Sequence, residues 1–173
     1  FGIFETKKKN DEDIVVDTKV TLHFLRQQTE LNKEHKFKSL CDYLSEDDYI
    51  GMFTTTIHGA EKLLSETDDD YYKIMVSSIC DRLAEASAEY IHFLMRTKYW
   101  GFENNTSFQK KYNGIRPAPG YPSQPDHSEL EAIFNLLDIN KNIDVNYTEN
   151  FAMYPASSVC ALVFSHPESS YFA

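Results

Sequence analysis

Several features that would assign the chain to a well-known class are missing from its 173 residues. The three cysteines, Cys41, Cys80 and Cys160, are far apart and form no Cys-x-x-Cys pair, which argues against a zinc ribbon, a thioredoxin-type site and a disulfide framework. No run of about 18 apolar residues and no secretory leader occurs, so a membrane span is not expected. These absences favour a reducing, cytoplasmic location.

Positive charge is also scarce in this chain. Seventeen Lys and Arg residues stand against 27 Asp and Glu residues, which gives a formal charge of −10. Affinity for nucleic acid or for an anionic membrane comes mainly from clustered cations. The only basic run, Lys7–Lys9, is followed at once by the acidic run Asp11–Asp13. We therefore expect neither nucleic acid nor a membrane as a partner.

The motifs of several enzyme classes are absent or incomplete. There is no glycine-rich phosphate loop and no Gly-x-Ser-x-Gly nucleophile motif. Glu89-x-x-His92 has the spacing of a di-iron helix, but the second copy that such a site needs is missing. The segment Asp138–Glu149 has oxygen ligands at EF-hand spacing, yet Ile143 stands where the loop requires glycine. We expect no metal site and assign no catalytic residue.

What the chain does have is the composition of one globular domain, with 42% hydrophobic and 25% charged residues. β-Branched residues predict strands near both ends, and helical periodicity predicts one long helix at about residues 70–99. This order is typical of a single α+β domain with a twisted, largely antiparallel sheet flanked by helices. The expected strands are 14–16, 18–24, 49–57 and 157–164, with another starting at Tyr171, and the expected short helices are 38–44 and 128–137.

Two faces of the long helix can be distinguished by the spacing of its residues. Apolar residues recur three or four positions apart and predict a buried stripe. They are Met75, Ile79, Leu83, Ala86, Tyr90 and Leu94. Polar residues at similar spacing predict a solvent-exposed face with ion pairs between successive turns. They are Ser78, Arg82, Glu85, Glu89, His92 and Arg96.

The segment 114–125 has an unusual concentration of proline. Four of the six prolines in the chain, Pro117, Pro119, Pro122 and Pro125, lie there. Each proline fixes its own φ at about −65° and restricts the residue before it, so we expect a stiff, extended loop.

The sequence from Gly114 to His127, GIRPAPGYPSQPDH, resembles the central motif of the activation domain of cobalamin-dependent methionine synthase. Other blocks that resemble signatures of this family follow one another in the family's order along nearly the whole chain. They are residues 25–30, 48–51, 69–76, 81–86, 99–101, 148–149 with 152–153, 164–167 and 170–173. Agreement over so many separate blocks is hard to produce by chance. The resemblance implies an activation domain over residues 1–173, truncated at both ends.

The resemblance implies a function as well as a fold. Domains of this family bind S-adenosylmethionine beside cobalamin, which a neighbouring domain carries, and support reductive methylation of cob(II)alamin to methylcobalamin. The implied partners are that cobalamin-binding domain and a flavodoxin-type or flavoprotein reductase electron donor. The chain would be part of a methyltransferase of methionine biosynthesis, a homocysteine S-methyltransferase, and would not be active alone. The alternative is a free-standing or degenerate S-adenosylmethionine-binding module without reactivation activity.

Matching motif positions imply that six residues bind S-adenosylmethionine. Arg116 would hold the ligand's carboxylate, because a guanidinium group can form two parallel charge-assisted hydrogen bonds with it. Glu85 would face the ligand's amino group. The other four are Ala118 at the adenine, Tyr121 near the transferring methyl group, and Tyr171 and Phe172 along the nucleoside.

Overall fold

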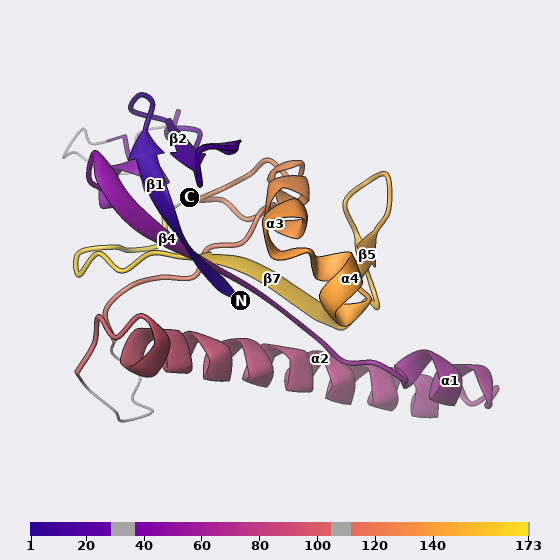
Figure 1. Ribbon diagram of the computed structural model, residues 1–173. Coiled ribbons are helices and arrows are strands. Elements are labelled where there is room, and N and C mark those ends of the chain that lie inside the picture. The colour runs from indigo at the N-terminus through magenta and orange to yellow at the C-terminus, as the bar shows by residue number, and fades with distance from the viewer. Residues whose placement is uncertain (29–36, 105–111, 173) are drawn as a thin grey trace.

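The computed structural model describes residues 1–28, 37–104 and 112–172, and its centre is a five-stranded antiparallel sheet (Figure 1). β4 is flanked by β1, from the start of the chain, and by β7, from near its end. The sheet therefore brings both ends of the sequence against its middle. In spatial order the strands are β3 (Val20–His23), β2 (Asp13–Val16), β1 (Gly2–Lys8), β4 (Asp47–Thr56) and β7 (Ser158–Val163).

The long helix predicted at about 70–99 is confirmed. It consists of α2 (Asp70–Leu94) and a final π-helical turn, η2 (Met95–Tyr99). The side chain of Asp69 starts it by accepting hydrogen bonds from the backbone N–H groups of Tyr71 and Tyr72, at 2.9 and 3.3 Å. Within the described ranges, no helix is both long enough and apolar enough to cross a membrane. The shorter elements are the 3₁₀ turn η1 (Leu40–Tyr43), α1 (Ala60–Ser65), α3 (Glu129–Leu137), α4 (Ile139–Ile143) and the small hairpin of β5 (Asn146–Tyr147) and β6 (Met153–Tyr154).

The sheet separates two hydrophobic layers, with α2 on one face and α3 and α4 on the other (Figure 1). Side chains alternate along a strand, so neighbouring residues serve opposite layers. On β7, Ala161 and Val163 belong to the layer with α2, whereas Cys160 and Leu162 belong to the layer with α3. The α+β class and the antiparallel sheet expected from the sequence are confirmed.

The observed strands differ from the expected ones at two places. β1 was not predicted, because Gly2–Lys8 carries two lysines at its end and only one buried residue, Thr6. Its position between β2 and β4 stabilises it through backbone hydrogen bonds on both sides. Tyr171 was expected to begin a strand, but Tyr171 and Phe172 belong to no strand. Their hydrogen bonds go to the proline-rich loop instead.

The predicted buried stripe of α2 is wrong, because the helix turns a different face toward the sheet. Tyr90, Ile79 and Leu83 are 55%, 52% and 50% exposed. The face that packs on the sheet is a row of mostly small residues one turn apart. This face also includes His92 and, in η2, Arg96, which were both expected to be solvated. These buried residues are Val76, Cys80, Ala84, Ala88, His92 and Arg96. Small side chains let the helix axis approach the sheet, so total hydrophobicity along a stripe does not decide which face is buried.

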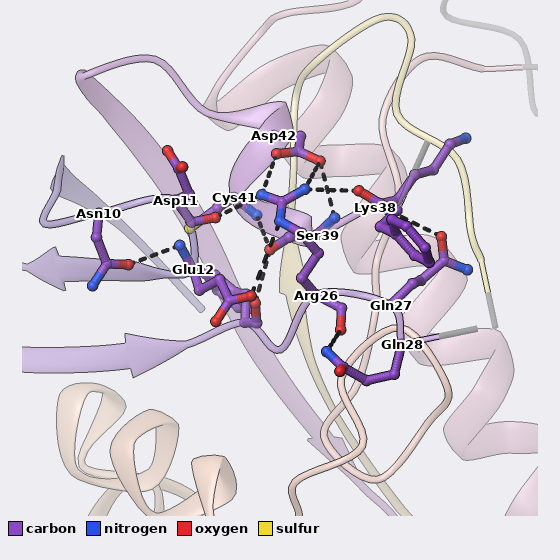
Figure 2. Close-up of polar contacts among 12 residues, drawn as sticks. Asn10, Asp11, Glu12, Arg26, Gln27, Gln28, Lys38, Ser39, Cys41 and Asp42 are labelled. Atoms are coloured by element: carbon purple, nitrogen blue, oxygen red, sulfur yellow. Dashed lines mark hydrogen bonds and ion pairs between the residues drawn. The ribbon is translucent and has the colours of Figure 1, made fainter. Parts of the chain in front are cut away.

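An arginine ties together the loops at the far edge of the sheet (Figure 2). The guanidinium of Arg26 donates to both carboxylate oxygens of Asp42, each at 2.8 Å, and to the carbonyl oxygens of Phe37 and Asp11 at 2.8 and 2.9 Å. The hydrogen bond to Asp42 raises the pKa of Arg26. Burial alone would raise the pKa of Asp42, but the hydrogen bonds from Arg26 and from the backbone of Ser39, together with the charge of Arg26, lower that pKa. A bidentate pair of this kind fixes direction as well as distance, so it joins three segments in one arrangement.

Candidate functional site

A cavity of about 550 Å³ lies where α2, β7, the proline-rich loop and the C-terminal segment meet. Val159 and Ala161 of β7 form part of its wall, and loop and C-terminal residues form most of the rest. All six residues that the resemblance implicated in binding line this one cavity. They are Glu85, Arg116, Ala118, Tyr121, Tyr171 and Phe172. The fold thus brings together residues up to 87 positions apart in sequence, counting from Glu85 to Phe172.

The first part of the proline-rich loop is held as an extra strand-like segment beside the end of β7. Ile115 and Phe164 exchange backbone hydrogen bonds at 3.1 and 3.0 Å, and the N–H of Leu162 donates to the carbonyl oxygen of Pro117 at 2.9 Å. Gly114 precedes this pairing with a φ of 88°, and a Cβ there would lie 2.4 Å from the carbonyl oxygen of Phe164. Only glycine fits such a close approach. The backbone conformation of Gly114 thus sets the direction in which the loop enters the cavity wall.

The second part of the loop is a turn rather than the extended segment expected from its prolines. The N–H of Gly120 donates to the carbonyl oxygen of Gln124, and the N–H of Gln124 donates to that of Tyr121, both at 2.8 Å. The imidazole of His127 packs directly on Gly120, with a ring carbon 2.3 Å from where a Cβ would be. The turn therefore presents Tyr121, which is 64% exposed, at the cavity rim.

The two aromatic residues near the C-terminus are fastened to the same loop. The hydroxyl of Ser123 donates to the carbonyl oxygen of Phe172 at 2.7 Å and accepts from its N–H at 3.1 Å. The phenol oxygen of Tyr171 accepts a hydrogen bond from the backbone N–H of Arg116 at 2.9 Å. Burial raises the pKa of Tyr171, so the phenol stays protonated at neutral pH. The two rings are thus positioned by polar contacts as well as by packing.

Arg116 has an acidic partner that the sequence analysis did not assign to the site. Its guanidinium forms an ion pair with the carboxylate of Glu89 on α2, and the two side chains are 20% and 33% exposed. Burial by itself would lower the pKa of Arg116, but the hydrogen bond and charge of Glu89 outweigh it and raise that pKa. The signal that could have found Glu89 is its spacing, because it lies one helical turn after Glu85.

A buried polar cluster lies beneath Arg116. The ring nitrogens of His92 have no hydrogen-bond partner within the described parts of the chain. Burial lowers the pKa of His92 to about 3, and the positive charges of Arg96 and Arg116 act in the same direction. Arg96 forms a buried ion pair with Glu103 and stacks on Tyr112, with 3.8 Å from its guanidinium carbon to the ring centroid. His92 is therefore neutral at physiological pH, and the positive charge below the cavity is balanced by Glu103.

Comparison with known proteins agrees with this geometry. The family model described as vitamin B12 dependent methionine synthase, activation domain, matches residues 1–173. The chain belongs to this family of methionine synthase activation domains. A solved structure, the MetH reactivation domain bound to AdoHcy, is 39% identical and superposes with a TM-score of 0.91. The match covers 99% of this activation domain chain and 59% of the solved chain, so the sequence spans little more than half of that relative.

Proposed function

We propose that this activation domain binds S-adenosylmethionine and S-adenosylhomocysteine in the cavity lined by Glu85 and Arg116. The observation that carries the proposal is the convergence of an arginine, a glutamate and two tethered aromatic residues on one cavity. Cavities of roughly 300–1,000 Å³ with apolar walls and a few placed polar groups are typical of small-molecule sites, and 550 Å³ lies within that range. The relative solved with AdoHcy, 39% identical, supports the same ligand class.

The ligand's amino-acid end carries one positive and one negative group, and the cavity offers one side chain of each opposite sign. Arg116 would bind the carboxylate through parallel N–H donors, and Glu85 would accept from the ammonium group. Tyr171 and Phe172 would pack along the nucleoside, with Ala118 presenting backbone groups to the adenine. Because the loop is already tied to β7 and, through Ser123, to Phe172, little further ordering is needed when the ligand binds.

The reaction we assign to the assembled enzyme is reductive methylation of cob(II)alamin. Cobalamin, held by the neighbouring domain, would supply the nucleophile for the methyl group of S-adenosylmethionine once a flavodoxin-type or flavoprotein donor has given it an electron, and S-adenosylhomocysteine would be the leaving group. Tyr121 lines the cavity and is largely exposed, which suits a residue near the transferring methyl group. The residues of this chain would bind and orient the methyl donor, a step in which close alignment lowers the barrier without a protein acid or base. We therefore assign no catalytic residue.

Calorimetric titration of the wild-type chain and of Arg116→Ala with S-adenosylhomocysteine tests the binding proposal. Loss of a charge-assisted contact costs about 1.5–3 kcal/mol, so we expect the dissociation constant to rise roughly tenfold to 150-fold. Arg82→Ala is the matched control, because Arg82 is exposed on α2 and does not line the cavity. No binding by the wild-type chain would contradict the proposal, and equal affinities for wild type and Arg116→Ala would remove Arg116 from the site.

A second assay separates reactivation from simple ligand binding. The chain is mixed with a cobalamin-binding domain loaded with cob(II)alamin, a flavodoxin-type electron donor and S-adenosylmethionine labelled in its methyl group. Label transferred to cobalamin only when the chain is present supports the reactivation function. Binding of S-adenosylhomocysteine without label transfer favours the alternative, a module that binds the ligand and reactivates nothing.

A further inference from the structure

We propose that Glu89 is a positioning residue that orients Arg116 toward the ligand's carboxylate and thereby makes the cavity selective for nucleosides that carry an amino-acid group. The inference rests on the function proposed above, since it concerns how the same cavity recognises one end of its ligand. Glu89 acts through Arg116, because the carboxylate of Glu89 pairs with the guanidinium and Glu89 does not itself line the cavity.

The arrangement of the two side chains explains why such a residue is needed. Arg116 follows the segment of the loop that pairs with the end of β7, and its backbone N–H is bound by the phenol oxygen of Tyr171. Its backbone is therefore held, while its long side chain has several rotatable bonds. Glu89 comes from a different element, α2, and holds one nitrogen of the guanidinium. Because the guanidinium is planar and rigid, its remaining N–H groups then point in a fixed direction.

The charges around the pair support the same role. Among the described residues, the charged side chains that face Arg116 are Glu89 beside it and Glu85 one turn earlier on α2, and the phenols of Tyr112 and Tyr171 face it as well. His92, below, is neutral at physiological pH. Without Glu89, a half-buried guanidinium would have Glu85 as the nearest carboxylate of the cavity wall. A guanidinium turned toward Glu85 would pair with the carboxylate that we assign to the ligand's ammonium group. Recognition of both the ligand's carboxylate and its ammonium group therefore depends on Glu89.

The test compares two ligands that differ only in the part that Glu89 is inferred to control. S-Adenosylhomocysteine carries the amino-acid group, whereas 5′-methylthioadenosine has the same nucleoside and thioether sulfur without it. For Glu89→Gln we expect at least about a tenfold loss of affinity for S-adenosylhomocysteine and less than about a twofold change for 5′-methylthioadenosine. Glu149→Gln, an exposed glutamate outside the cavity, is the matched control and should change neither affinity.

A double-mutant cycle shows whether Glu89 acts through Arg116. In the Arg116→Ala background, Glu89→Gln should cause no further loss of affinity for S-adenosylhomocysteine, because the group that it orients is gone. Additive losses, or equal losses for both ligands, would overturn the inference, since a merely structural role affects both ligands alike. The ratio of the two affinities is independent of the folded fraction of a variant. If the wild-type chain binds and Glu89→Gln leaves the ratio of the two ligand affinities unchanged, this inference alone is overturned. If the wild-type chain does not bind S-adenosylhomocysteine, the proposed function is overturned as well.

Discussion

Gly114 offers the sharpest test of how the backbone builds the cavity wall. Its φ is 88°, in the left-handed region, and a Cβ added there would lie 2.4 Å from the carbonyl oxygen of Phe164. That oxygen accepts the hydrogen bond from the N–H of Ile115, so it cannot move away without breaking the pairing that anchors the loop. Gly114→Ala therefore combines an unfavourable φ with a backbone clash.

Gly59 is a matched control for the first of these two effects. Its φ is 91°, and nothing lies within 4 Å of where its Cβ would be. Gly59→Ala should therefore cost only the left-handed conformation, about 1–2 kcal/mol. Gly114→Ala should cost that amount plus about 1–3 kcal/mol for the forced backbone shift, in total about 2–5 kcal/mol.

Urea denaturation of the wild-type chain and of both variants measures these costs as free energies of unfolding. Titration with S-adenosylhomocysteine then shows whether the damage reaches the cavity. We expect Gly114→Ala to weaken binding, because Arg116 is two residues away, and Gly59→Ala to leave binding unchanged. Equal free-energy losses for the two variants would refute the argument that the contact with Phe164, rather than the φ angle, requires glycine.

Two further predictions concern the buried cluster beneath the cavity. Glu103→Ala should lower the free energy of unfolding by about 3–5 kcal/mol because it leaves Arg96 buried and unpaired, and Arg96→Met combined with Glu103→Leu should recover most of that loss in the same denaturation assay. His92 has a pKa of about 3 in the folded chain and about 6.5 when unfolded, so the unfolded state binds the extra proton between these values. Stability should therefore fall as the pH drops through that window, by up to about 1.4 kcal/mol per pH unit, and His92→Phe should flatten the dependence. A similar pH profile for that variant would show that other groups control acid sensitivity.

The class of fold and the position of the loop could be predicted because they depend on local patterns. β-Branched runs favour strands wherever they occur, and β4 and β7 were found where such runs predicted them. The start of α2 depends on Asp69 capping its own helix, a contact between near neighbours in sequence. The family motif around Arg116 and Tyr121 could likewise be read without coordinates, since it is a string of adjacent residues.

Only the tertiary structure decided which surfaces meet. The spacing of residues on α2 defines several stripes, and the sheet selected the one in which Ala84 and Ala88 permit close approach rather than the more hydrophobic one with Ile79 and Leu83. The pairing of Glu89 with Arg116 depends on where a loop from elsewhere in the chain crosses that helix. Such contacts join residues distant in sequence, and their energies depend on burial and geometry that no local pattern encodes. The sequence alone therefore determined the family and most of the elements, though not β1, while packing determined how the cavity is assembled.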